Sequence, residues 1–254
     1  MKKALNYLPL IDFDIYQQLI IEEAILKKNK DNWLITNIPL DPTIVMGISN
    51  TLEKMINLPL LANAPLCIVR RFSGGGTVIT DQNTIFITFI MNSSDTVSSI
   101  PGKVFDWISN IYEEILPASS RLKENDFVIS DKKFGGNAQY MKRDRWLHHT
   151  SFLWDYSELN MNYLKIPERA PLYRAQRSHT DFICKLKPFY SEKQDLFKQL
   201  VKKLNSLFKI EYKEENSLEI LKAIVDLSVK STYKFTHEEI LSCVQVNTLA
   251  NSLA

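Results

Sequence analysis

The 254-residue sequence holds few of the residues that define disulfide-rich, metal-binding or membrane-spanning proteins. Its three cysteines, Cys67, Cys184 and Cys243, are far apart without a CxxC pair, which argues against a zinc site or disulfide framework and favours a reducing compartment. No run is long and apolar enough to span a bilayer, and the N-terminus lacks the apolar core of a signal peptide. We therefore expect a cytoplasmic protein, or one of an organelle matrix if eukaryotic, without a membrane partner. The net charge of +2 gives no reason to expect a nucleic-acid partner.

Glycine is also scarce, and its distribution is the most informative feature of the chain. Five of the seven glycines fall in two clusters, at 74–76 and 135–136. Glycine has no side chain to bury and is costly to order, so such clusters indicate backbone that turns sharply or that a ligand approaches closely. Cations lie beside both clusters, Arg70 and Arg71 before the first and Lys133 before the second. We therefore expect the ligand to be anionic.

Hydrophobic periodicity predicts an α+β fold, a mixed β-sheet with flanking helices packed on one side. The expected helices span 13–27, 50–56, 103–116, 190–208, 216–229 and 236–246. The expected strands span 33–38, 43–47, 64–72, 77–80, 84–91, 124–130, 146–154 and 209–212. Residues 1–208 are expected to form the catalytic domain, and 209–254 a short C-terminal extension that is not a full accessory domain.

The first glycine cluster is expected to be the loop of a hairpin-like unit, between strands over 64–72 and 77–80. A loop of glycines can present several N–H groups on one concave surface. Neighbouring side chains on a strand point to opposite faces, so one of Arg70 and Arg71 can reach a ligand while the other supports the sheet edge. A tight hairpin with solvated arginines is the competing interpretation, and the cluster alone does not decide between them.

Other polar positions suit an anionic substrate. Lys133 precedes a Gly-Gly turn, where its ammonium can neutralise phosphate or carboxylate charge, although a solvated turn lysine is the alternative. Asp126, which follows Asn125 at the head of a strand, can hold Mg²⁺ or merely form an Asx turn. In the pair His148-His149, successive imidazoles on a strand face opposite ways, so we expect a positioning or hydrogen-bonding histidine and not a metal ligand.

Two further segments leave their roles open. The basic loop over 173–179 carries Arg174 and Arg177 and is either a mobile lid over an anionic intermediate or an exposed loop. Cys184 has apolar neighbours that suggest a buried thiol, and a nucleophilic role would require a lowered pKa. No Gly-x-Ser-x-Gly elbow is present, which argues against a serine hydrolase.

Four motifs, in order along the chain, resemble those of the lipoate–protein ligase A family. Residues 70–81 match the pattern RRxSGGGxVxHD, and 125–128 match an asparagine-aspartate pair that leads into a strand. Residues 133–138 match the lysine motif KxSGNA, and 148–153 match the strand HHGTLL. Each motif alone is weak, but together they are specific and cover roughly residues 10–190.

Three positions depart from the family pattern. Gly135 replaces the serine of the lysine motif. Thr80 stands where a histidine is usual, so it keeps a hydroxyl but loses an imidazole. Thr150 replaces a glycine, and we expect its branched side chain to add bulk near the acyl channel.

The resemblance implies the fold of the biotin and lipoate ligase catalytic domain, with ATP and Mg²⁺ as cofactors. The carboxylate of lipoate or octanoate would attack the α-phosphate of ATP. A lysine of a lipoyl carrier, either a 2-oxoacid dehydrogenase E2 subunit or the glycine cleavage H protein, would then accept the acyl group. Lys133 is the expected catalytic residue. The expected substrate-binding residues are Arg70, Ser73, Gly74, Gly75, Gly76, Val78, Thr80, Gly136, Asn137, Ala138 and His149. The expected nucleotide-binding residues are Asn125, Asp126, Arg174 and Arg177, with Asp126 holding Mg²⁺.

Other functions stay open beside this one. The short extension suggests a separate accessory protein, or an ATP-independent octanoyl or lipoyl transferase with Cys184 as a candidate nucleophile. A non-catalytic lipoate-binding protein is a third hypothesis, for which Thr80 and Thr150 would be signs of decay. Biotin ligase is a related alternative, which the arginine-glycine motif and the tandem histidines disfavour.

Overall fold

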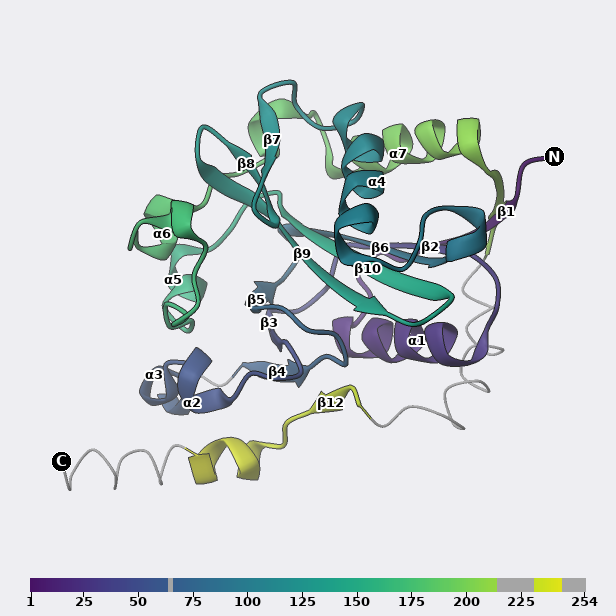
Figure 1. The fold of residues 1–254 in the computed structure, drawn as a ribbon. Coiled ribbons are helices and arrows are strands. Elements are labelled where there is room, and N and C mark those ends of the chain that lie inside the picture. Colours follow the sequence, from purple (N-terminus) through teal and green to yellow (C-terminus); the bar gives the residue numbers. More distant parts are fainter. Residues whose placement is uncertain (64–65, 214–230, 244–254) are drawn as a thin grey trace.

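The computed structural model describes residues 1–63, 66–213 and 231–243, which form two β-sheets with helices around them (Figure 1). The large sheet has eight strands, in the order β11 (Lys209–Tyr212), β1 (Ala4–Pro9), β2 (Trp33–Asn37), β6 (Thr84–Asn92), β10 (Arg145–Leu153), β9 (Lys132–Met141), β8 (Asp126–Ile129) and β7 (Ser120–Lys123). The small sheet has four, in the order β12 (Tyr233–Lys234), β4 (Cys67–Arg70), β3 (Thr43–Met46) and β5 (Thr77–Thr80).

The α-helices are α1 (Ile15–Lys28), α2 (Leu52–Met55), α3 (Leu58–Asn63), α4 (Pro101–Glu113), α5 (Glu158–Met161), α6 (His179–Phe182) and α7 (Lys193–Leu207). Short 3₁₀ turns lie at Ser93–Asp95, Leu172–Arg174 and Lys187–Phe189. In the parts of the chain that the structure describes, no helix is both long and apolar enough to cross a membrane.

The expected mixed sheet is confirmed. Strand β1 runs parallel to both β2 and β11, whereas β6 runs antiparallel to β2 and β10, and β8 antiparallel to β7 and β9. The expected helices over 13–27, 103–116 and 190–208 correspond to α1, α4 and α7. Strand β1 was not expected, although its four central residues are buried and it lies between β11 and β2 in the large sheet.

Helices cover both faces of the large sheet, so the expectation of helices on one side is wrong. Helices α4 and α7 lie on one face and α1 on the other (Figure 1). The physical reason is visible in β2, where Leu34 packs into the core below α4 and α7 while its neighbour Ile35 packs against α1. Both side chains are fully buried. Successive strand residues face opposite ways, so a strand with this continuous apolar run must be covered on both faces.

The strands on either side of the first glycine cluster do not form the expected hairpin. Strands β4 and β5 each pair with β3, which lies between them. Residues 71–76, which we call the glycine loop, therefore cross the end of β3, where the amide of Ile48 donates to the Ser73 carbonyl at 3.0 Å. Gly75 has a φ of +96°, a conformation that side-chain-bearing residues rarely adopt.

The second glycine cluster lies within β9 and not in the expected turn. The turn before β9 is made by Ser130 and Asp131, both with positive φ. Opposite the step from Phe127 to Val128, the partner residue on β9 shifts from Gly135 to Lys133, which is a β-bulge. Bulges of this kind redirect side chains near functional sites, and here the bulge lies directly at the predicted catalytic lysine.

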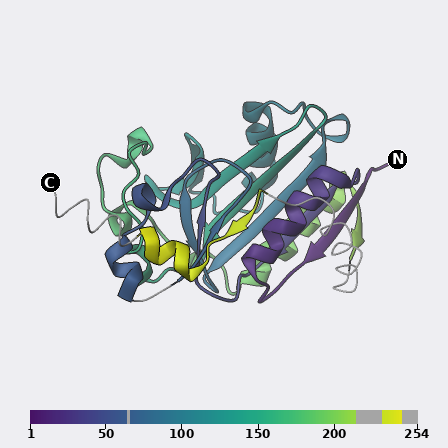
Figure 2. The same cartoon turned by 90° about the horizontal axis from the view of Figure 1, so that it is seen from below.

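The described residues of the expected C-terminal extension complete both sheets. Strand β11 pairs with β1 at the edge of the large sheet, and β12 pairs with β4 at the edge of the small one. Figure 2 shows residues 231–243 along the small sheet, with a short helix at their end. The expected helix over 216–229 and the last part of the one over 236–246 lie outside the described residues. A domain boundary at residue 208 stays a prediction.

Candidate active site

A cavity of about 440 Å³ lies between the glycine loop, strands β8 and β9, and the segment that carries α5 and α6. The motifs of the sequence, which are up to about a hundred residues apart, converge on it. Nine of the predicted site residues line it: Gly75, Gly76, Val78, Asn125, Asp126, Lys133, Gly136, Asn137 and Arg174. The predicted residues outside its walls are Arg70, Ser73, Gly74, Thr80, Ala138, His149 and Arg177.

A narrower pocket of about 70 Å³ adjoins this cavity and reaches Ala138 and His149. Val78 and Lys133 line both spaces. The pocket wall combines apolar side chains with the buried guanidinium of Arg71. Lys133 thus lies where the two spaces meet, beside the glycine loop.

Lys133 is held by the elements on both sides of it. Its carbonyl accepts the amide of Cys184 at 2.8 Å, and its Nζ lies 2.8 Å from Asp126 Oδ1. The side chain of Lys133 is 25% exposed and that of Asp126 only 8%, so this ion pair is partly shielded from water. A Cβ on Gly136 would lie 3.0 Å from the ammonium nitrogen, so the glycine gives the lysine room against the strand. The ammonium therefore faces the cavity region and not bulk solvent.

The residues around Asp126 do not fit a resident Mg²⁺ site. Its Oδ1 lies against Lys133, and its Oδ2 accepts the hydroxyl of Tyr173 at 2.8 Å. The carbonyl of Asn125 accepts the side-chain amide of Asn137 at 2.9 Å. Among the described residues, no three histidine, cysteine or acidic side chains gather where they could hold a metal ion. The expectation that Asp126 holds Mg²⁺ therefore finds no support in this arrangement.

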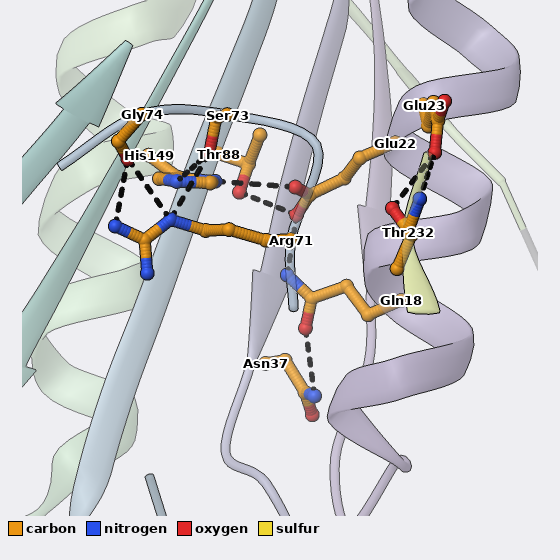
Figure 3. A network of polar contacts seen from close by, with 10 residues as sticks. All are labelled: Gln18, Glu22, Glu23, Asn37, Arg71, Ser73, Gly74, Thr88, His149 and Thr232. Carbon is orange, nitrogen blue, oxygen red and sulfur yellow. Dashed lines mark hydrogen bonds and ion pairs between the residues drawn. The ribbon is translucent and has the colours of Figure 1, made fainter. Parts of the chain in front are cut away.

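The two arginines before the glycine loop point to opposite sides. The guanidinium of Arg70 lies over the ring of Phe235, 4.8 Å from its centroid, and so packs against the segment beyond β12. Arg71 instead lies under the loop and is 4% exposed. Its Nη2 donates to the carbonyl of Gly74 at 2.8 Å (Figure 3). It also donates to the carbonyl of Gly76 at 2.9 Å. The arginine that lines the adjoining pocket is therefore Arg71, and the geometry gives no support to the predicted substrate contact of Arg70.

A chain of buried polar groups continues from Arg71 to helix α1 (Figure 3). Arg71 Nε donates to Ser73 Oγ at 3.1 Å, which leaves the Ser73 hydroxyl to donate to His149 Nε2 at 3.1 Å. His149 then carries its proton on Nδ1, 3.3 Å from Glu22 Oε2. Glu22 also accepts from Thr88 at 2.6 Å and is fully buried. These hydrogen bonds therefore connect the glycine loop to a carboxylate on α1.

Burial sets the charge states in this network. It lowers the pKa of Arg71 to about 10, while the charge of Glu22 acts in the opposite direction. It also lowers the pKa of His149, again against Glu22, so the imidazole is neutral. From the sequence, it stayed open which of Arg70 and Arg71 faces the ligand. Only Arg70 was placed among the expected site residues, and Glu22 was not singled out. Gln18 and Glu22, four residues apart on the buried side of the predicted helix, were the available signal, because polar side chains there need buried partners.

The departures from the family pattern occupy buried positions outside the cavity. Thr80 is fully buried, and its hydroxyl lies 3.5 Å from the Thr43 carbonyl. Thr150 is also fully buried and donates to Asn137 Oδ1 at 2.7 Å. Thr150 does not line either space, so the expected bulk near an acyl channel is not seen. Its hydroxyl instead orients Asn137, which does line the cavity.

The basic segment near Arg174 is bound to the turn between β7 and β8. Glu124 accepts the backbone amides of Leu172 and Tyr173, at 3.3 and 3.2 Å. Arg174 is buried with its guanidinium 4.8 Å from the ring centroid of Phe182, and Arg177 donates to the carbonyl of Tyr173 at 2.7 Å. Arg174 therefore lines the cavity, whereas Arg177 stabilises the segment behind it.

Cys184 lacks the features of a nucleophile in this structure. It does not line the cavity or the adjoining pocket. Burial raises the pKa of its thiol, which donates to the carbonyl of Lys132 at 3.3 Å. A thiolate would need the opposite shift.

Known proteins are similar to this chain over more than half of its length. A 26% identical relative from Plasmodium falciparum (isolate 3D7), named inactive lipoate–protein ligase 2, covers 73% of this chain. A 31% identical relative from Mycoplasma genitalium, named probable lipoate–protein ligase A, covers 56% of it. The chain spans 65% and 44% of the length of these two relatives.

The fold has close structural counterparts. A solved structure of lipoate–protein ligase A bound with ATP covers 90% of this chain, with 96% of that chain covered, at a TM-score of 0.68 and 17% identity. This likeness confirms the expected fold. The model of the lipoyl protein ligase A/B catalytic domain matches residues 14–205, well over half of the chain. The chain therefore belongs to the lipoyl protein ligase A/B catalytic domain family.

Proposed function

We propose that this protein activates lipoate or octanoate with ATP and transfers the acyl group to a lysine of a lipoyl carrier domain. One observation carries the proposal. Lys133 is a shielded cation at the border of a large cavity and a narrower pocket, beside the side-chain-free backbone of Gly76. The family assignment and the ATP-bound structural counterpart support the choice of acid and nucleotide.

The first step requires two anions to meet. A carboxylate oxygen of the acid attacks the α-phosphorus, the bond from that phosphorus to the bridging oxygen breaks, and pyrophosphate leaves with the electron pair. The ammonium of Lys133 can interact with both the carboxylate and the phosphate, which reduces their repulsion and stabilises the charge of the transition state. In the second step the carrier amine attacks the acyl carbon and AMP leaves.

The two spaces suit the two substrates. The pocket of about 70 Å³ has Val45, Val78 and Phe86 in its wall, which fits an apolar acyl chain. The cavity of about 440 Å³ has Lys165, Arg169 and Arg174 in its wall, which fits the triphosphate. ATP carries Mg²⁺ on its phosphate oxygens, and no residue of this chain is assigned to the metal.

The proposal is tested by measuring pyrophosphate release and carrier mass in the presence of lipoate, Mg²⁺-ATP and a lipoyl domain. We expect both products with the full chain, and a loss of about 100-fold or more in rate for Lys133→Ala. The exposed neighbour Lys132 provides the matched control, since Lys132→Ala should keep the rate. No adenylate and no modified carrier from the unaltered protein would contradict the proposal.

A second candidate is a lipoate-binding protein without ligase activity. The observation in its favour is the Plasmodium relative, 26% identical, whose name calls it inactive. Calorimetry with lipoate alone separates the two candidates. Saturable binding without pyrophosphate release in the presence of ATP would favour the binding protein.

A further inference from the structure

We infer that Tyr173 is a positioning residue that acts on Lys133 through Asp126. The inference rests on the proposed function, in which the Lys133 ammonium is the group that contacts both substrates. It assigns to the carboxylate of Asp126 the role of a counter-ion, in place of the expected metal ligand. Tyr173 does not line the cavity, so it acts only through that carboxylate.

The geometry divides the carboxylate of Asp126 between two donors. The Tyr173 hydroxyl donates to Oδ2 at 2.8 Å, and the Lys133 ammonium lies 2.8 Å from Oδ1. Asp126 is 6% exposed, so water competes little for either oxygen. The Lys133 ammonium has three N–H donors. When only Oδ1 of Asp126 accepts from it, one of these donors is used. The other two can serve a carboxylate and a phosphate.

Tyr173 is held in place from three sides. Its backbone amide donates to Glu124 at 3.2 Å, its ring lies 5.1 Å from that of Phe182, and the ammonium of Lys123 lies 5.2 Å from its ring centroid. Burial raises the pKa of Tyr173, and the charge of Asp126 raises it further, so the hydroxyl keeps its proton and remains a donor. The contact with Asp126 is therefore preorganised by neighbours that are independent of Lys133.

The consequence is a defined direction for the ammonium. Without the Tyr173 donor, Oδ2 becomes available, and the carboxylate can rotate to take the ammonium with both oxygens. The lysine would then be drawn toward Asp126 and away from the two substrates. This predicts an effect on turnover and little effect on the affinity for ATP, because binding of the nucleotide also uses other cations in the cavity wall.

The test compares Tyr173→Phe, Asp126→Asn and the double variant in the full chain, with pyrophosphate release as the readout. We expect Tyr173→Phe to lower kcat about tenfold with KM for ATP within about twofold, since a hydrogen bond to a charged group is lost. The double variant should match Asp126→Asn alone, because Tyr173 acts through that carboxylate. Tyr156→Phe is the matched control, a tyrosine of the same apolar cluster outside the cavity wall.

A second readout does not depend on ligase activity. The reaction of Lys133 with acetic anhydride, quantified by mass spectrometry, should fall at least about twofold in Tyr173→Phe, because the ammonium is then held by both oxygens of Asp126, and stay the same in Tyr156→Phe. If the unaltered protein makes no adenylate, the proposed function fails while this labelling still tests the positioning. Additive effects in the double variant, or labelling of Tyr173→Phe equal to that of the unaltered protein, would overturn the inference.

Discussion

At the scale of single residues, the chain from Arg71 through Ser73 and His149 to Glu22 explains how a loop of glycines keeps one shape. Along this chain each donor faces an acceptor. The chain begins at the guanidinium of Arg71 and ends at the carboxylate of Glu22, which carry opposite charges. A buried cation is costly unless an anion and hydrogen bonds compensate it. The carboxylate on α1 therefore stabilises the backbone that borders the cavity, although it lies outside both spaces.

Replacing Glu22 by glutamine keeps its size and removes its charge. We expect the free energy of unfolding, measured with urea, to fall by about 2 kcal/mol or more, because Arg71 stays buried without a nearby anion. The control is Glu114→Gln, at an exposed ion pair with Lys203, which should change stability by no more than about 0.5 kcal/mol. Equal values for the two variants would contradict the role given to Glu22.

The tandem histidines predict how stability depends on pH. Burial lowers the pKa of His148 to about 3 from 6.5 and also lowers that of His149. The unfolded chain therefore binds more protons than the folded one below about pH 6.5, so the free energy of unfolding should decrease from there toward pH 3. The expected slope from His148 is about 1.4 kcal/mol per pH unit. His148→Gln should reduce this slope when the free energy of unfolding is measured with urea at a series of pH values. The control is His237→Gln, at an exposed histidine. Equal slopes for the two variants would contradict the role given to His148.

At the scale of elements, strand β9 delivers the lysine to the cavity. The bulge opposite Phe127 and Val128 lies at the start of β9, and the two glycines follow within the strand. The glycine at 136 leaves space that the ammonium of Lys133 occupies. The element is thus built around the position of one side chain.

Gly136→Ala should disturb that position with little cost to the fold. The added Cβ would lie 3.0 Å from Nζ and 3.1 Å from Cε of Lys133, and the far end of a lysine can move aside. We expect adenylate formation to slow at least about tenfold while the melting temperature changes little. Gly102→Ala is the matched control, because nothing lies within 4 Å of its Cβ. A rate equal to that of the control would show that the space is not needed.

At the scale of the whole molecule, residues far apart in sequence close the structure around the site. Thr232 donates to Glu23 on α1 through both its amide, at 2.9 Å, and its hydroxyl, at 2.7 Å. Beyond it, the ring of Phe235 packs on the guanidinium of Arg70, the last residue of β4. The segment 231–243 therefore joins α1 to the small sheet from which the glycine loop begins (Figure 2).

Thr232→Val removes the hydroxyl at this junction and keeps the shape of the side chain. The buried carboxylate of Glu23 then loses one donor, so we expect unfolding in urea to require about 1–3 kcal/mol less free energy. Ser119→Ala, which removes the hydroxyl of an exposed serine, is the control and should cost less. Equal costs at the two positions would show that the junction adds nothing to stability.

The local periodicities of the sequence are sufficient to predict α1, α4, α7 and most strands, because those elements follow from spacing alone. Spacing does not say which strands pair, so β3 between β4 and β5 could not be foreseen. The same limit applies to the site. The motifs identify Lys133, Asp126 and the glycines. The contact between Glu22 and His149 joins residues 127 positions apart, and only the assembled sheets bring them together.

The central claim is that the acid attacks the α-phosphate of ATP beside Lys133. Lipoate labelled with ¹⁸O in both carboxylate oxygens tests it most directly, in a reaction with unlabelled ATP and a lipoyl domain. Carrier attack on the acyl carbon leaves the bridging oxygen with AMP. The account predicts AMP with one ¹⁸O atom from the unaltered protein and from Lys132→Ala, and the same labelled AMP formed about 100-fold more slowly from Lys133→Ala. A modified carrier together with unlabelled AMP, or without AMP, would contradict it.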